Sequence, residues 1–148
     1  MTSPDTAEDE VKREMIKVIL QEFPKQGFTD IKTDSGEQMR LGKEEEYTPD
    51  VTFKRNDEHR TLVIMAVETC SALAEERTGR KWRVFHEEAK RVSGQFHLAV
   101  PRFCNGNSGR DVANRRLEEL HLEADAIWAI NGSLRYFAMR AKKQNGNR

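Results

Sequence analysis

Cysteine is scarce in this sequence, and its scarcity narrows the chemistry that the chain can carry. Only Cys70 and Cys104 occur among the 148 residues. The two are far apart and neither has a nearby second ligand, so the spacing excludes a cysteine-based metal site of the zinc type. We therefore expect two free thiols in a reducing cytoplasm, with a disulfide between them as the alternative.

Long apolar runs and an excess of charge of one sign are also absent. No run approaches the ~18 apolar residues of a membrane-spanning helix, and the N-terminus is polar and acidic, without the apolar core of a signal peptide. Basic and acidic side chains number 25 each, so the formal net charge is zero. A net charge of zero does not by itself indicate nucleic-acid binding, although a basic face opposite an acidic site is compatible with it. We expect a cytoplasmic protein with no membrane partner.

The length and the apolar pattern predict one α/β domain over residues 1–140, followed by a disordered basic tail over 141–148. Apolar spacing predicts helices at 4–23, 80–93 and 110–121, and strands at 28–33, 48–55, 61–70, 96–100 and 124–130. Asn131-Gly132 favours a last hairpin strand at 134–139, with a helix there as the competing interpretation. The segment 105–109 is expected to be a plain loop.

The resulting order, α-β-β-β-α-β-α-β, indicates a three-layer α/β/α domain with a mixed central sheet. The first three strands would form an antiparallel meander, and crossover connections would lead to the later strands. Leu62 to Val67 is apolar and uncharged, which favours a central position for that strand. Trp82 and Trp128 fall at apolar positions, so we expect both in the core rather than stacked on bases.

Two acids flank the hairpin formed by the second and third strands. Asp50 lies at the start of the strand 48–55, and Glu68 lies near the end of the strand 61–70. If the strands pair antiparallel across the turn at Asn56-Asp57, both carboxylates reach the same end of the sheet. Two acids brought together there repel each other and lose hydration, so they need a cation. Magnesium, bound through one or two carboxylates and a substrate phosphate, is the usual solution.

Pro49-Asp50, followed after about one hairpin by Glu68-Thr69-Cys70, resembles the active-site hairpin of the PD-(D/E)xK nuclease superfamily. The resemblance implies a restriction-endonuclease-like fold, Mg²⁺ or Mn²⁺ as cofactor and DNA as partner, with a homodimer left open. It further implies that Asp50, Glu68 and the backbone carbonyl of Thr69 hold the metal. Several families of this superfamily place an acid on the first helix near the metal, which makes Glu14 an additional candidate ligand.

The resembled motif ends in a lysine, and Cys70 stands at that position here. We expect Lys81 to replace it, because Lys81 lies at the rim of the apolar face of the second helix, one turn before Phe85. Without a replacement, the resemblance implies an inactive nuclease-fold module that binds nucleic acid or protein. Cys70 beside Glu68 also leaves a thiol nucleophile open, although its histidine base cannot be located from the sequence.

Three basic residues lie at the start of the second predicted helix: Arg80, Lys81 and Arg83. This basic set is either a solvated helix face or a surface that contacts phosphates. Together with the acid pair, it leads to the expectation of a metal-dependent DNA endonuclease that hydrolyses phosphodiester bonds. The alternative is the inactive binding module.

Overall fold

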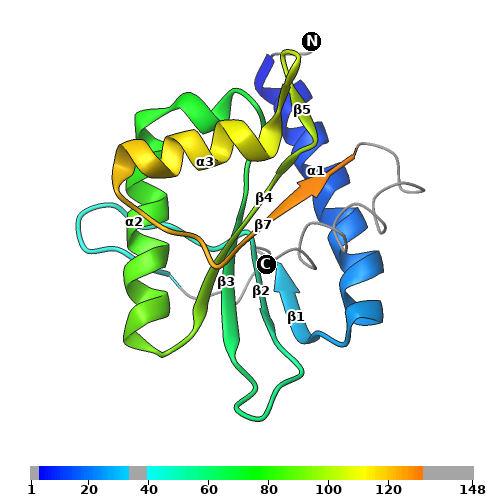
Figure 1. The fold of residues 1–148 in the computed structure, drawn as a ribbon, viewed down its shortest axis with the longest axis vertical. Helices are drawn as coiled ribbons and strands as arrows, with labels where there is room; N and C mark the ends of the chain where they lie inside the picture. Colours follow the sequence, from blue (N-terminus) through cyan, green and yellow to red (C-terminus); the bar gives the residue numbers. More distant parts are fainter. Residues whose placement is uncertain (1–3, 34–39, 132–148) are drawn as a thin grey trace.

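The computed structural model describes residues 4–33 and 40–131, which fold into helices packed on a β-sheet (Figure 1). The predicted strand at 134–139 and the tail at 141–148 lie outside these residues. In chain order the elements are α1 (Pro4–Glu22), η1 (Phe23–Gln26), β1 (Thr29–Thr33), β2 (Val51–Lys54), β3 (Leu62–Val67), η2 (Ala72–Ala74), α2 (Glu76–Arg91), β4 (Gln95–Pro101), β5 (Phe103–Cys104), β6 (Asn107–Ser108), α3 (Gly109–Leu120) and β7 (Ala126–Ile130).

The main sheet of the described chain has five strands in the order β1-β2-β3-β4-β7. Strands β1, β2 and β3 pair antiparallel, whereas β4 pairs parallel with both β3 and β7. The predicted α/β class, mixed sheet and antiparallel meander are therefore confirmed. Strand β3 is central, as its uncharged run predicts, because a strand buried on both faces cannot accommodate unpaired charge.

Alternate residues of β3 face two different helical layers. Val63, Met65 and Val67 pack in the core beneath α1, and Ile64 and Ala66 pack in the core beneath α2 and α3. All five are fully buried. Burial of each large apolar side chain contributes about 2 kcal/mol relative to exposure. The two helical layers therefore fix the register of β3, because a shift by one residue would exchange its two faces.

Helix α1 covers one face of the sheet through an apolar stripe at helical spacing. Met15, Val18 and Ile19 are buried there, and Phe23 continues the stripe into η1. Pro24 lacks the amide that a continuing helix would use, and Gly27 ends the segment at a positive φ of 91°. The predicted first helix is confirmed. Within the described residues no helix has the length and apolar character needed to cross a lipid bilayer.

Helix α2 begins four residues earlier than the apolar pattern predicts, at Glu76 rather than Arg80. Gly79, which directly precedes the predicted start, is buried inside the helix. A Cβ at this position would come 3.0 Å from the Leu120 side chain of α3. Gly79 therefore allows the two helices to approach closely, which outweighs its poor helix propensity.

The segment after β4 is a short hairpin, so the expectation of a plain loop at 105–109 is wrong. Strands β5 and β6 pair antiparallel, with Cys104 opposite Asn107. Asn105 and Gly106 form the two-residue turn, both with positive φ, at 51° and 82°. This Asn-Gly pair has the backbone of a type I′ turn, but two-residue strands are too short for an alternating pattern.

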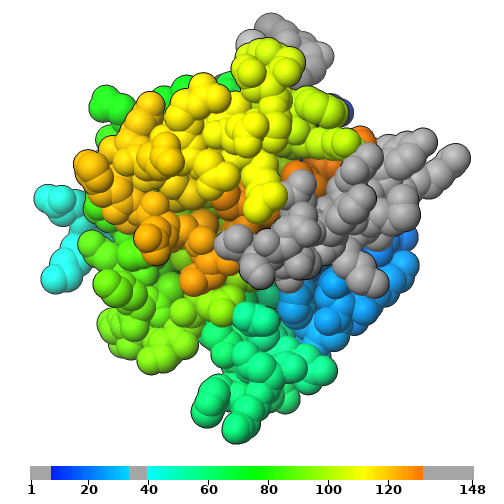
Figure 2. Space-filling model, viewed as in Figure 1, coloured from blue at the N-terminus to red at the C-terminus, as the bar shows by residue number. Residues whose placement is uncertain are grey.

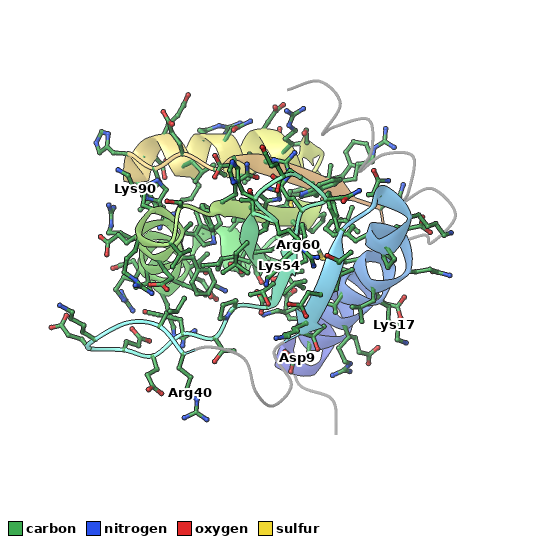
Figure 3. All side chains as sticks on the ribbon, turned by 90° about the horizontal axis from the view of Figure 1, so that it is seen from below. Asp9, Lys17, Arg40, Lys54, Arg60 and Lys90 are labelled. Atoms are coloured by element: carbon green, nitrogen blue, oxygen red, sulfur yellow. A yellow bond between two sulfur atoms is a disulfide. The ribbon has the colours of Figure 1, made fainter. Side chains whose placement is uncertain are left out.

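Charged side chains project from many elements of the described chain, as Figure 3 shows for Lys17 on α1, Arg60 in the β2–β3 turn and Lys90 on α2. The space-filling view shows α3 and the β5–β6 hairpin together on one face (Figure 2). That hairpin lies at the end of the sheet where β3 and β4 terminate (Figure 1).

Candidate functional site

Asp50 and Glu68 lie at the same end of the sheet. Asp50 immediately precedes β2, Glu68 immediately follows β3, and the Asp50 amide donates to the Met65 carbonyl at 3.2 Å. The Glu68 amide donates to the Ala99 carbonyl of β4 at 2.9 Å, so the sheet holds the backbone of this residue. The two acids are only 3% and 2% exposed. Buried acids of this kind require charged partners.

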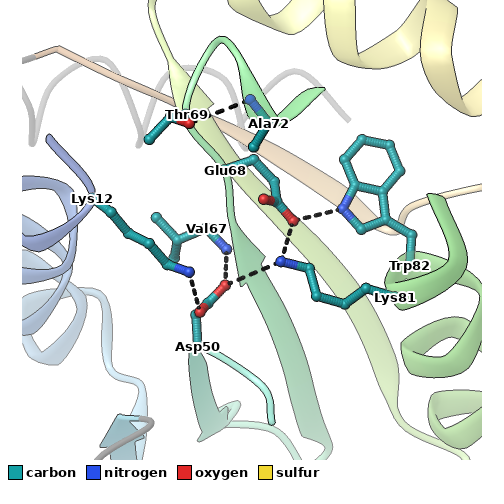
Figure 4. A network of polar contacts seen from close by, with 8 residues as sticks. All are labelled: Lys12, Asp50, Val67, Glu68, Thr69, Ala72, Lys81 and Trp82. Atoms are coloured by element: carbon teal, nitrogen blue, oxygen red, sulfur yellow. Dashed lines mark hydrogen bonds and ion pairs between the residues drawn. The ribbon is translucent and has the colours of Figure 1, made fainter. Parts of the chain in front are cut away.

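The first partner of Asp50 is a lysine from α1. Lys12 Nζ lies 2.7 Å from Asp50 Oδ1, and the Val67 amide donates to Asp50 Oδ2 at 2.7 Å (Figure 4). Lys12 remains 30% exposed, so its ammonium reaches the buried acid from the edge of the core. The hydrogen bond from the Val67 amide to one carboxylate oxygen leaves the other oxygen for Lys12.

Lys81 of α2 connects the two acids. Its ammonium lies 2.8 Å from Glu68 Oε2 and 4.0 Å from Asp50 Oδ2 (Figure 4). The Trp82 indole N–H donates to the same Glu68 oxygen at 2.8 Å. Successive residues of one helix thus supply a cation and a neutral donor to Glu68. Two acids and two lysines form a network without net charge at this end of the sheet.

The pKa of Glu68 is raised above its ordinary value. Burial is the largest cause, because it disfavours the ionised carboxylate, and repulsion from Asp50 adds to it. The Lys81 charge, its hydrogen bond and the Trp82 hydrogen bond oppose the shift. Glu68 therefore binds a proton more readily than an exposed glutamate, and a second cation near it would favour the ionised form.

This shift leads to a prediction about stability without metal. Because the pKa of Glu68 is higher in the folded than in the unfolded state, its contribution is present below the ordinary value of 4.5 and is lost as pH rises through the folded pKa. In EDTA, urea denaturation should therefore show this component of the unfolding free energy falling as pH rises from 4.5. Glu68→Gln should lack this component. An unchanged pH profile in that variant would contradict the assignment to Glu68.

Glu14, the candidate ligand on the first helix, is exposed and pairs with Lys17 at 3.6 Å. Glu8 and Lys12, one helical turn apart on α1, reach this end of the sheet. Glu8 accepts a hydrogen bond from the Ser71 hydroxyl at 2.6 Å, and this bond, with one from Thr69, lowers its pKa. Their spacing of four residues, in line with Met15 and Ile19, is the sequence signal that could have identified them.

Thr69 is the third expected metal ligand, through its backbone carbonyl. This carbonyl accepts the Leu73 amide at 3.2 Å, and the Thr69 hydroxyl accepts the Ala72 amide at 3.4 Å. These bonds fold the chain into η2 directly after Glu68. A carbonyl oxygen has two lone pairs, so the bond to Leu73 leaves one for another partner.

Cys70 is joined to Cys104 by a disulfide, and the described chain has no free cysteine. The expectation of two free thiols is therefore wrong, and Cys70 has no thiolate with which to act as a nucleophile. The two residues meet because β3 and β4 are parallel neighbours whose C-terminal ends lie side by side. The position that is lysine in the resembled motif instead connects the end of β3 with the β5–β6 hairpin.

The expected basic set at the start of α2 does not act as one face. Arg80 pairs with Glu45 at 3.5 Å, and Arg83 donates to the Leu120 carbonyl at 3.0 Å. Lys81 points instead to the two acids, as described above. Successive side chains of a helix are about 100° apart, so neighbouring basic residues separate to different partners.

The described residues contain no cluster of three or more histidine, cysteine, aspartate or glutamate side chains that could hold a metal ion. A site built here would rely on two carboxylates and a carbonyl. That donor set suits Mg²⁺ or Mn²⁺, which prefer oxygen ligands, and Mg²⁺ commonly keeps several waters or takes substrate phosphate oxygens.

No protein-family model, no curated protein and no solved structure matches this chain.

Proposed function

We propose that the chain is a metal-dependent phosphodiesterase that cuts DNA, with the restriction-endonuclease-like fold of the PD-(D/E)xK nucleases. The observation that supports it best is the position of Lys81. One ammonium, supplied by a helix, lies within 4.0 Å of two buried acids that come from adjacent antiparallel strands. This arrangement brings together two acids and a lysine, the groups that the resembled motif requires, although the lysine comes from α2.

In this proposal Asp50, Glu68 and the Thr69 carbonyl hold Mg²⁺ or Mn²⁺. When bound, the cation would lower the pKa of an attacking water and neutralise charge developing on the phosphate. Lys81 would donate to the water or to a phosphate oxygen, since its three N–H groups exceed its one close contact with Glu68. Trp82 would orient Glu68 through its indole N–H, and the buried position of the acids would limit competing solvent.

A second candidate function is an inactive nuclease-fold module that binds nucleic acid or protein. It is supported by Lys12, whose ammonium already lies against Asp50 Oδ1 at 2.7 Å. With Lys12 and Lys81 in place, the charge of both acids is balanced without any metal. In the enzyme, Lys12 would have to leave Asp50 or share it with the cation, and its partly exposed side chain has solvent to move into.

Manganese binding separates the two candidates. We expect wild-type protein to bind Mn²⁺ in calorimetric titrations, and Asp50→Asn to abolish this binding because the neutral amide removes one of the two negative charges that would hold the cation. The Asn side chain can still accept the Val67 amide, so circular dichroism should show a folded variant. Glu14→Gln serves as the control and should bind Mn²⁺ as wild type does.

Two results would count against the enzyme. If wild type does not bind Mn²⁺, the inactive module is the better description of the chain. If Glu14→Gln loses binding and Asp50→Asn keeps it, the metal lies elsewhere than at the end of β3. Binding of Mn²⁺ accompanied by cleavage of plasmid DNA would support the enzyme directly.

A further inference from the structure

A cavity of about 410 Å³ lies among η2, the β5–β6 hairpin and α3. Its volume falls within the range of about 300–1,000 Å³ that is common for small-molecule sites. The Cys70–Cys104 disulfide, Leu73 and Val112 form an apolar wall. Cys70 is the second residue after Glu68, so the backbone that carries the acid also forms this wall.

The other side of the cavity is polar and basic. Asn105 and Asn107 contribute amides from the hairpin, and Arg115 and Arg116 contribute guanidinium groups from α3. Val112, Arg115, Arg116 and Glu119 recur at helical spacing, so a single face of α3 lines the cavity. Two arginines against one glutamate leave this face with an excess of positive charge.

The two arginines differ in their partners. Arg116 donates to Glu119 Oε1 at 3.2 Å and to the Glu75 carbonyl at 3.3 Å, yet its Nε is buried with no hydrogen-bond partner in the described chain. Arg115 is exposed and forms no ion pair with any described residue. A buried N–H without an acceptor is costly, so the Arg116 side chain is incompletely hydrogen-bonded where it borders the cavity.

We propose that this cavity binds one unpaired nucleotide of the nucleic-acid substrate. The nucleotide's phosphate would contact Arg115 and Arg116, and its base would lie against the apolar wall with its polar edge toward Asn105 and Asn107. Arginine and phosphate form strong charge-assisted hydrogen bonds. An unpaired base can bury the apolar surface of its ring against an apolar wall and form hydrogen bonds along its exposed edges.

This inference rests on the proposed function and narrows its substrate class. A base inside a duplex presents only its edges, so it cannot place its ring in the cavity without leaving the stack. The chain would therefore act on single strands, ends or junctions with an unpaired nucleotide next to the cut bond. An intact duplex would lack the nucleotide that the cavity holds.

Binding in EDTA tests the inference without cleavage. The measurement is the fluorescence anisotropy of a labelled oligothymidylate of about twelve nucleotides, a length typical of single-strand sites. Arg115→Gln should weaken binding about tenfold, as expected for loss of a charged hydrogen bond. Arg60→Gln is the control, because it removes the same charge from the exposed β2–β3 turn at the opposite end of the sheet. Equal losses in both variants would overturn the inference.

A second variant tests the base rather than the charge. Ala74 lines the cavity and is exposed, so Ala74→Trp should fill the space while the fold and net charge stay unchanged. We expect it to weaken oligothymidylate binding at least as much as Arg115→Gln does. Unaltered binding would show that no base enters the cavity.

Competition experiments identify the ligand. Thymidine monophosphate should displace the labelled strand far better than inorganic phosphate, and a blunt duplex should compete more weakly than the single strand. Equal competition by phosphate would overturn the nucleotide assignment. If Arg115→Gln loses oligothymidylate binding but wild type cuts no DNA, the nucleotide site is supported and the nuclease function is rejected. If wild type cuts DNA, and Arg115→Gln binds and cuts it as well as wild type does, only the nucleotide site is rejected.

Discussion

Lys81→Met should lower the rate of DNA cleavage by about 10²–10⁴-fold, the range for loss of a group that assists proton transfer. Methionine keeps an unbranched side chain of similar length but has no charge and no N–H to donate. Because Lys81 lies 2.8 Å from Glu68, its removal takes away the only cation in the described chain that contacts this acid. Mn²⁺ binding should persist, since both carboxylates remain and a competing cation is gone.

Lys90→Met is the matched control for this variant. Lys90 lies in the last turn of the same helix, is exposed and contacts neither acid. Cleavage rates and calorimetric Mn²⁺ titrations on both variants would separate chemistry from folding. Equal cutting by wild type and Lys81→Met would eliminate Lys81 as the replacement lysine. If wild type cuts no plasmid or single-stranded DNA with Mg²⁺ or Mn²⁺, the inactive module is favoured.

Reduction of the Cys70–Cys104 disulfide should lower the free energy of unfolding by about 3–4 kcal/mol. The bond joins residues 34 positions apart, and the chain between them includes η2, α2 and β4. Opening this loop increases the conformational entropy of the unfolded chain, which favours unfolding. Urea denaturation with and without reductant measures the difference.

Cys104→Ser provides the control for the reductant itself. This variant cannot form the bond, so its urea midpoint should be the same under both conditions and close to that of the reduced wild type. A reduced wild type as stable as the oxidised protein would show that the disulfide contributes nothing to stability. A reductant-dependent midpoint in Cys104→Ser would show that the effect comes from elsewhere.

The acid pair could be found from the sequence because local rules determine it. In a β-hairpin, the start of the first strand and the end of the second strand lie at the same end of the sheet. An acid at each of these positions is therefore brought near the other, whatever the rest of the chain does. The orientation of Lys81 follows from a rule of the same kind, since Trp82, Phe85 and Ala89 define the buried face of α2 and Lys81 adjoins it. The catalytic role of that lysine stays a prediction.

Lys12 was not predicted, and the disulfide was predicted only as the alternative to free thiols, because both depend on how distant elements meet. The spacing of Lys12 from Met15 and Ile19 places it in line with the buried stripe of α1, but its contact with Asp50 also requires the placement of α1 against the end of the sheet, which that spacing does not specify. Cys70 and Cys104 approach only because β4 returns parallel to β3. Their separation in sequence therefore indicated independence, whereas the topology makes them neighbours.

The indole of Trp82 gives the protein an internal optical reporter. Its N–H donates to Glu68 in one core, while the second tryptophan, Trp128, is buried in the other core and donates to His97 Nδ1 at 3.1 Å. Emission from an indole is sensitive to nearby charge, and these two rings lie in separate surroundings on opposite faces of one sheet. Any event that changes the charge of Glu68 is therefore registered by one chromophore, with the other as an internal reference.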